Sequence, residues 1–217
     1  MIFAIRMVTA MGFTRGIMLE GISCSGKTSV FKEIKRLHGN GRENERSVIA
    51  LGEHYSQVLN KTDDGLVRLD QDAHLSLLNE RLSMVEQLNQ WACSLGEARR
   101  QSRGLFVLFE RFYLNHIAAF NTPSVSIENR CNQLGLKCVL LTISDDNIAN
   151  RIRLRDTQMG VVRTADAITK QASDYLAGQE RFVMAINRVS IPSLILNTDS
   201  MDWTSFAHDI LNFSDST

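Results

Sequence analysis

The stretch GISCSGKTS, residues 21 to 29, decides the fold that this sequence predicts. Gly21 and Gly26 bracket four small or polar residues, and Lys27 and Thr28 follow, so the stretch matches the pattern G-x-x-x-x-G-K-[ST]. Such a loop wraps a phosphate with successive backbone N–H groups, and glycine is needed where the chain turns most tightly. The helix that begins at the loop adds the positive end of its dipole. The stretch therefore predicts a phosphate-binding loop.

The residue types in this loop suit a nucleoside triphosphate and its metal ion. Lys27 can reach the β- and γ-phosphates, and the Thr28 hydroxyl can bind Mg²⁺. We expect Cys24 to be a small filler rather than a nucleophile, because its position suggests no histidine or asparagine partner. The predicted ligands are ATP and Mg²⁺. The predicted nucleotide-binding residues are Gly21, Ser23, Cys24, Ser25, Gly26, Lys27, Thr28 and Ser29.

Apolar and amphipathic runs alternate on both sides of the loop. The runs typical of buried strands are 16–20, 47–54, 104–110, 137–144 and 192–198. A helix is predicted directly after the loop, a long one over 72–99, and two more around a proline-bearing turn near Thr122, while 63–71 is interpreted as a polar connector. This alternation predicts an α/β fold of three layers, a P-loop NTPase fold whose five-stranded parallel sheet is flanked by helices and carries a small helical lid. Ligands of such sheets bind beyond the carboxyl ends of the strands.

Length and composition favour one domain over residues 1–217, with an N-terminal extension at 1–15 and a lid segment at about 151–164. Lysine plus arginine equals aspartate plus glutamate at 24 each, which argues against a broad nucleic-acid surface. No apolar run is long enough to cross a bilayer. The four cysteines form no CxxC pair, so we expect reduced thiols in a cytoplasmic protein.

Short motifs elsewhere in the chain resemble the thymidylate kinase-like group of nucleotide kinases, which includes the deoxynucleoside kinases. The matching motifs are Glu20-Gly21 at the loop, Glu80-Arg81 on the long helix, Glu110-Arg111-Phe112 after the third strand, an arginine-rich segment at 151–163 and Tyr175-Leu176. The resemblance implies ATP-dependent phosphoryl transfer to a nucleoside monophosphate or a nucleoside. It also implies that 196–200 holds the adenine, mainly through backbone atoms.

The chain departs from this group where the acceptor is recognised. His54 follows Glu53 where the group has a proline. Asn115 and Phe120 stand where thymidylate kinases usually show a serine and an aromatic-glutamine pair that reads thymine. The acceptor therefore stays open between thymidylate and other compounds.

Charged residues at the strand ends are the candidates for the chemistry. Glu110 is predicted to hold Mg²⁺ together with Thr28, and the alternative is an ordinary salt bridge. Arg111 is predicted to face an acceptor phosphate or to hold the carboxylate partner of the acceptor. Glu53 either takes a proton from an attacking hydroxyl, orients the acceptor sugar, or is a solvated loop carboxylate. Arg81 is a further substrate-binding candidate, with an exposed helical arginine as the alternative.

The lid candidates are the arginines of 151–163. Arg151 and Arg155 share one helix face, Arg153 points elsewhere, and Arg163 follows Gly160, a predicted hinge. The alternative for any of these arginines is a solvated helix face. The predicted catalytic residues are Lys27, Glu53, Arg111, Arg151 and Arg155.

The sequence leaves two alternatives to the kinase function, and it does not decide whether the chain forms a homodimer. The chain is either a kinase of nucleotides or nucleosides, a phosphotransferase for another hydroxyl compound, or a nucleotide-binding regulatory protein without kinase activity. The partner is a small-molecule acceptor. A homodimer through the apolar stripe of the long helix is permitted; the stripe consists of Leu75, Leu78, Leu82, Val85 and Leu88.

Overall fold

The computed structural model of the protein describes residues 14–39, 47–55, 58–62, 65–94 and 104–216. Its strands are β1 (Thr14–Glu20), β2 (Ser47–Leu51), β3 (Leu59–Thr62), β4 (Gly65–Arg68), β5 (Leu105–Glu110), β6 (Leu136–Thr142) and β7 (Ser193–Asn197). Its helices are α1 (Lys27–Gly39), α2 (Gln71–Ser94), α3 (Tyr113–Phe120), α4 (Val125–Gln133), α5 (Asp145–Met159), α6 (Ala165–Ile186) and α7 (Trp203–Asp215), with a 3-10 turn at Glu53–Tyr55.

The predicted parallel sheet of five strands is confirmed. Its order is β2-β5-β1-β6-β7, and every neighbouring pair is parallel. β1 lies in the centre, with β2 and β5 on one side of it and β6 and β7, which follow later in the chain, on the other. The carboxyl end of β1 is therefore the switch point at which ligands of such sheets bind, and the loop 21–26 follows it directly.

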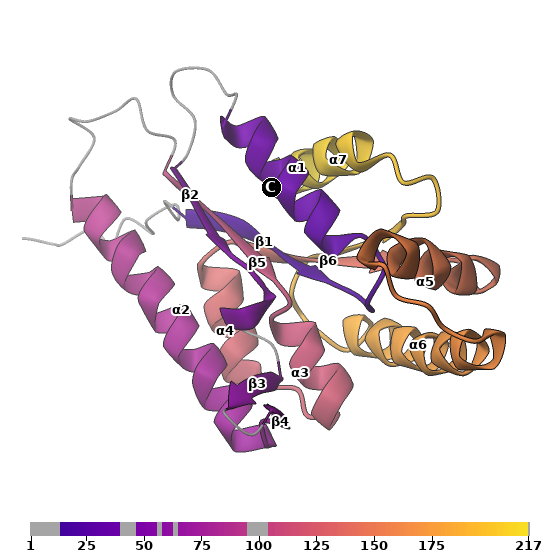
Figure 1. Ribbon diagram of the computed structural model, residues 1–217. Helices are drawn as coiled ribbons and strands as arrows, with labels where there is room; N and C mark the ends of the chain where they lie inside the picture. The colour runs from indigo at the N-terminus through magenta and orange to yellow at the C-terminus, as the bar shows by residue number, and fades with distance from the viewer. Residues whose placement is uncertain (1–13, 40–46, 56–57, 63–64, 95–103, 217) are drawn as a thin grey trace, which may run out of the picture.

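Helices cover both faces of the sheet (Figure 1), and alternate residues of β1 pack against the two helical layers. Ile17 and Leu19 of β1 belong to the core cluster formed with α1 and α7. Met18 belongs to the larger cluster formed with α2, α3, α4 and α6. Because both faces are covered, β5 is buried along its whole length, as its continuous apolar run predicts.

The prediction of a polar connector at 63–71 is wrong. Residues Gly65–Arg68 of that stretch form β4, which pairs with β3 as an antiparallel hairpin, with Leu59 opposite Arg68 and Thr62 opposite Gly65. Residues 63 and 64 lie outside the described chain. The signal in the sequence was Asp-Asp-Gly at 63–65, because a glycine after acidic residues favours a hairpin turn. Gly65 itself has φ +121°. The hairpin stands apart from the main sheet, beside the start of α2 (Figure 1).

The other predicted elements differ from the structure at their ends. The second strand stops at Leu51, and residues 53–55 form the 3-10 turn. The long helix is described from Gln71 to Ser94, and residues 95–99 of the prediction lie outside the described chain. The predicted extension 1–15 also lies outside it, except that Thr14 and Arg15 already belong to β1.

The stripe of the long helix packs inside the chain. Leu78, Leu82 and Val85 are fully buried in the core cluster on that face of the sheet, and Leu75 packs against it. Leu88, the last residue of the stripe, is half-buried. The homodimer that the stripe permits stays a prediction.

Candidate functional site

The loop between β1 and α1 has the backbone that the phosphate-binding pattern requires. Gly21 and Gly26 have φ values of +138° and +87°, and Cys24 lies between them at +68°. A Cβ on Gly21 would come within 2.4 Å of the Leu141 carbonyl oxygen, so a larger residue does not fit there. Thr198, directly after β7, donates from its hydroxyl to the Ser25 carbonyl at 3.0 Å and thereby holds the loop from the far side.

Lys27 begins α1 and folds its side chain back across the loop. Its Nζ donates to the carbonyl oxygens of Gly21 at 2.9 Å and Ile22 at 2.6 Å. Burial lowers the pKa of Lys27 to about 7, and the positive charge of Arg111 adds to this effect. Because a nearby opposite charge favours the charged form of a lysine, a bound phosphate would raise this pKa.

Thr28, in the first turn of α1, meets Glu110 at the carboxyl end of β5. The Thr28 hydroxyl donates to Glu110 Oε1 at 2.6 Å, and both residues line the same cavity. Among the described residues, no three His, Cys, Asp or Glu side chains form a metal cluster. One hydroxyl and one carboxylate fit Mg²⁺, because this ion binds through one or two protein oxygens and completes its shell with water and phosphate oxygens.

Glu53 and Arg111 form an ion pair opposite the loop. Arg111 Nε donates to Glu53 Oε2 at 2.9 Å, and its Nη2 lies 3.5 Å from the Ser23 hydroxyl. Burial raises the pKa of Glu53, but the charge and the hydrogen bond of Arg111 outweigh it, so the pKa lies below its ordinary value. Glu53 is therefore a weak proton acceptor, and its position favours orienting Arg111 over general base catalysis.

Glu20, the last residue of β1, holds the turn that carries Arg111. Its Oε1 accepts the backbone N–H groups of Phe112 at 2.8 Å and Leu114 at 3.0 Å, which caps α3. Phe112, the residue before α3, makes no side-chain cap of its own. Burial raises the pKa of Glu20 to about 7 despite these hydrogen bonds.

Two of the four lid arginines reach the loop. Arg151 is buried on α5 and donates from Nε to the Cys24 carbonyl at 3.3 Å, with its guanidinium 5.1 Å from the centre of the Trp203 ring. Arg155, one turn further, lies 3.8 Å from Cys24 Sγ. Their i, i+4 spacing places both on the face that meets the loop, as the sequence predicts.

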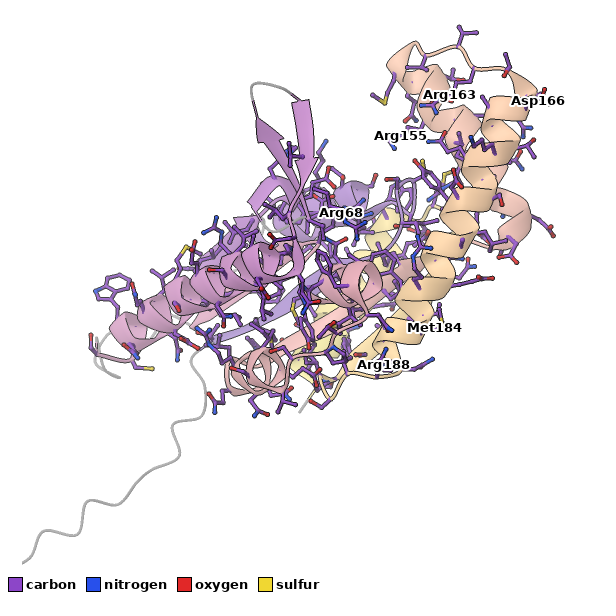
Figure 2. The ribbon with its side chains drawn as sticks, turned by 90° about the horizontal axis from the view of Figure 1, so that it is seen from below. Arg68, Arg155, Arg163, Asp166, Met184 and Arg188 are labelled. Atoms are coloured by element: carbon purple, nitrogen blue, oxygen red, sulfur yellow. The ribbon has the colours of Figure 1, made fainter. Side chains whose placement is uncertain are left out.

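The other two lid arginines are bound within the lid itself. Arg153 is exposed and donates to Asn150. Arg163 pairs with Asp156 at 3.1 Å and joins the end of α5 to the start of α6 (Figure 2). Gly160 ends α5 in the left-handed conformation at φ +67°, so it acts as a helix cap in this structure.

These groups surround one cavity of about 340 Å³. Its lining includes most of the residues predicted from the sequence: Ser23, Cys24, Gly26, Lys27, Thr28, Ser29, Glu53, Glu110, Arg111, Arg151 and Arg155. Arg81 is not among the lining residues, and its guanidinium lies 3.7 Å from the neighbouring Glu80. Leu154, Gln158, Met201 and Trp203 complete the lining and were not predicted.

A second cavity, of about 510 Å³, lies between the hairpin, α3 and α6. Its lining residues are Val58, Arg68, Asn115, Ala118, Ala119, Gly178, Arg181 and Phe182. Arg68 at the hairpin donates to the Ala119 carbonyl at 2.9 Å and lies over the Phe120 ring (Figure 2). The buried Asn115 Nδ2 has no hydrogen-bond partner within the described residues. The sequence signalled Asn115 and Phe120 but not the hairpin arginine.

The two cavities are lined by elements that are neighbours along the chain. Asn115 follows Arg111 by four residues, and Val58 follows the 3-10 turn that carries Glu53. On the other side, Gly178 of α6 packs towards Ile22 of the loop, since a Cβ placed there would lie 3.4 Å from the Ile22 side chain. The arrangement can hold two ligands, one at the loop and one between α3 and α6.

Comparisons with known proteins support the fold alone. No family model and no curated protein matches the chain. Among solved structures it is similar to the YorR protein of Bacillus subtilis in complex with phosphorylated GDP, with a TM-score of 0.57, 14% identity, and 91% of this chain and 94% of that one covered. APE1195 matches with a TM-score of 0.45 and 13% identity over 93% and 94% of the two chains. The first similarity agrees with the predicted P-loop fold, and the thymidylate kinase-like resemblance stays a prediction.

None of the helices in the described ranges has the length and apolar character needed to cross a membrane.

Proposed function

We propose that this protein is an ATP- and Mg²⁺-dependent kinase that transfers the γ-phosphoryl group to a nucleoside monophosphate. The observation that carries the proposal is the convergence of Lys27, Thr28 and Glu110 with Arg111 and the lid arginines around one cavity. Phosphoryl transfer asks mainly for positioning and charge neutralisation, and these groups supply both. YorR was solved with phosphorylated GDP, which supports a nucleotide ligand for a protein of this fold.

The donor triphosphate binds along the loop. The backbone N–H groups of residues 21–27 surround the β-phosphate, and Lys27 turns from the Gly21 and Ile22 carbonyls towards the β- and γ-oxygens. Thr28 and Glu110 hold Mg²⁺, which neutralises charge on the phosphates when it is bound. Arg151 and Arg155 stabilise the charge that develops on the transferred group, because their guanidinium groups approach the loop from the lid.

The acceptor binds in the second cavity with its phosphate towards Arg111. An oxygen of that phosphate attacks the γ-phosphorus, the bond to the bridging oxygen breaks, and ADP leaves. A phosphate oxygen is already ionised at neutral pH, so no general base is needed. This agrees with the low pKa of Glu53, which disfavours a nucleoside hydroxyl as the acceptor.

The alternative of a regulatory protein is weaker for a physical reason. A protein that only binds a nucleotide has no use for a second cavity lined by Arg68 and Arg181 beside the first. A phosphotransferase for another hydroxyl compound would need a proton acceptor near the γ-phosphate, and Glu53 is a weak one.

The test is ADP release from ATP with a panel of nucleosides and nucleoside monophosphates. We expect turnover with at least one monophosphate and none with the matching nucleoside. Lys27→Met should lower kcat/KM by roughly 100-fold or more, because it removes a charge that stabilises the transferred group. The matched control is Lys32→Met, an exposed lysine on the same helix, which should stay within about twofold. ATP binding without release of ADP by any acceptor would contradict the proposal and favour the regulatory alternative.

A further inference from the structure

Cys24 places a thiol on the wall of the phosphate-loop cavity. It is half-buried and lines that cavity. Its backbone has φ +68°, where glycine or asparagine is favoured, so the local conformation does not select a cysteine. The backbone of the loop therefore does not account for a cysteine at this position, and the reason must lie in the groups around the thiol.

The surroundings of the thiol are strongly cationic. Arg155 Nη1 lies 3.8 Å from Cys24 Sγ. Lys27, Arg111 and Arg151 line the same cavity, opposed by only two carboxylates, Glu53 and Glu110. Partly exposed cysteines in electropositive surroundings are the reactive ones.

A second observation on the same wall is a guanidinium donor without an acceptor in the described part of the chain. Arg151 is 8% exposed, and its Nη1 is buried without a hydrogen-bond partner among the described residues. Its Nε donates to the Cys24 carbonyl, so this unpartnered donor belongs to the residue that touches the cysteine itself. An unpaired guanidinium donor that is nine-tenths buried calls for an acceptor oxygen from a ligand.

The remaining cysteines in the described chain differ from Cys24 in one of these respects. Cys131 and Cys138 are fully buried, and burial raises the pKa of both thiols. Cys93 is exposed near the end of α2, where Asn89 is its contact. Cys93 thus shows how fast an exposed thiol reacts away from the cationic cavity at the loop. Cys131 and Cys138 show the reaction of thiols that the reagent does not reach.

We infer that Cys24 is a site of reversible modification by an anionic low-molecular-weight disulfide of the glutathione class. A carboxylate of the disulfide pairs with Arg151 or Arg155 while the thiol loses its proton to water. The Cys24 sulfur attacks one sulfur of the disulfide, a new S–S bond forms, and the old one breaks. The other half leaves as a thiolate and takes up a proton, so one disulfide is exchanged for another.

The modification and the triphosphate exclude each other. The added group occupies the cavity of about 340 Å³ in which the phosphates would bind, and it uses the same guanidinium groups. Nucleotide binding is then lost under oxidising conditions and returns when a thiol reductant cleaves the mixed disulfide. This gives the loop a redox control that is independent of which acceptor the protein uses.

The test is peptide mass spectrometry of the full chain after incubation with oxidised glutathione or with neutral hydroxyethyl disulfide. We expect the ratio of modified Cys24 to modified Cys93 to be roughly fivefold higher, or more, with the anionic reagent. Arg155→Gln should remove most of this difference, because the ratio for the anionic reagent should fall much more than the ratio for the neutral one. Inorganic tripolyphosphate with Mg²⁺ should protect Cys24 and leave Cys93 reactive, and dithiothreitol should restore the unmodified chain.

Equal ratios with the two disulfides, or modification of Cys93 alone, would overturn the inference. These outcomes are separate from the kinase proposal, because they are measured without ATP and without an acceptor. A chain that shows the anion preference but never releases ADP would retain this site and lose the proposed function.

Discussion

A methyl group at Gly26 tests the packing that holds the phosphate loop. Gly26 has φ +87°, and a Cβ there would lie 2.3 Å from Trp203 Cζ3 and 2.6 Å from Cη2. Carbon atoms pack at about 3.5–4.0 Å, so the indole would have to move by more than an ångström. Trp203 is the first residue of α7, and its ring lies against the guanidinium of Arg151, which limits that movement. Gly26→Ala therefore adds about 1–3 kcal/mol of overpacking to about 1–2 kcal/mol for the left-handed backbone.

Gly160→Ala separates these two contributions. Gly160 has φ +67°, but no atom lies within 4 Å of a Cβ placed there, so only the backbone cost of about 1–2 kcal/mol applies. The double variant Gly26→Ala/Trp203→Ala removes the collision and should show a favourable coupling free energy of about 1–3 kcal/mol. Urea denaturation of the wild type, the two glycine variants, Trp203→Ala and the double variant measures each loss in the free energy of unfolding. Equal losses for the two glycine variants, or a coupling free energy near zero, would refute the reasoning.

Two further predictions follow from buried charges at the loop. The pKa of Glu20 is raised from 4.5 to about 7, so the stability it contributes is fully present below pH 4.5 and is lost as the pH rises to about 7. Glu20→Gln keeps the acceptor for α3 and lacks the charge, so its stability relative to the wild type should rise by about 2–3 kcal/mol between pH 5 and pH 8 in urea denaturation. A difference that does not change with pH would contradict this. The pKa of Lys27 is lowered to about 7, so the free protein loses the ammonium above that pH. Affinity for ADP, measured by calorimetry, should therefore fall by up to about tenfold per pH unit between pH 7 and pH 9, while Lys27→Met binds weakly at both values; constant wild-type affinity would count against a phosphate contact of Lys27.

The sheet and the loop could be predicted because their signals are local. A buried strand, a glycine-bracketed loop and an amphipathic helix follow one another within residues 14–39, so pattern and spacing are enough. The shared face of Arg151 and Arg155 is likewise a local consequence of i, i+4 spacing. The strands of the sheet are continuous apolar runs, which buried parallel strands require.

The parts that were missed depend on contacts between distant segments. Trp203 reaches the loop only because α7 packs against α1, and no spacing near residue 203 indicates this contact. Arg68 reaches its cavity from a short hairpin outside the main sheet. The strands of this hairpin are too short to show a clear alternation of apolar and polar residues, so the sequence there resembles a polar connector. Arg81 was predicted at the site because its position in the helix put it near buried leucines, but the cavity at the loop lies elsewhere. Helical periodicity predicts which face of a helix is buried. It does not predict which cavity a side chain at the edge of that face reaches.

Glu20 holds the walls of the two cavities in a fixed position relative to each other. It ends the strand from which the phosphate loop begins, and its carboxylate caps α3, the helix that forms a wall of the second cavity. Arg111 lies between these two hydrogen-bonded segments at φ +62°, and its own N–H donates to the Leu19 carbonyl at 2.8 Å. A non-glycine residue in this conformation costs about 1 kcal/mol or more, and it persists only where neighbouring contacts hold it. The buried carboxylate supplies that constraint, so the cost of burying Glu20 is linked to the direction in which Arg111 points towards Glu53 and the loop.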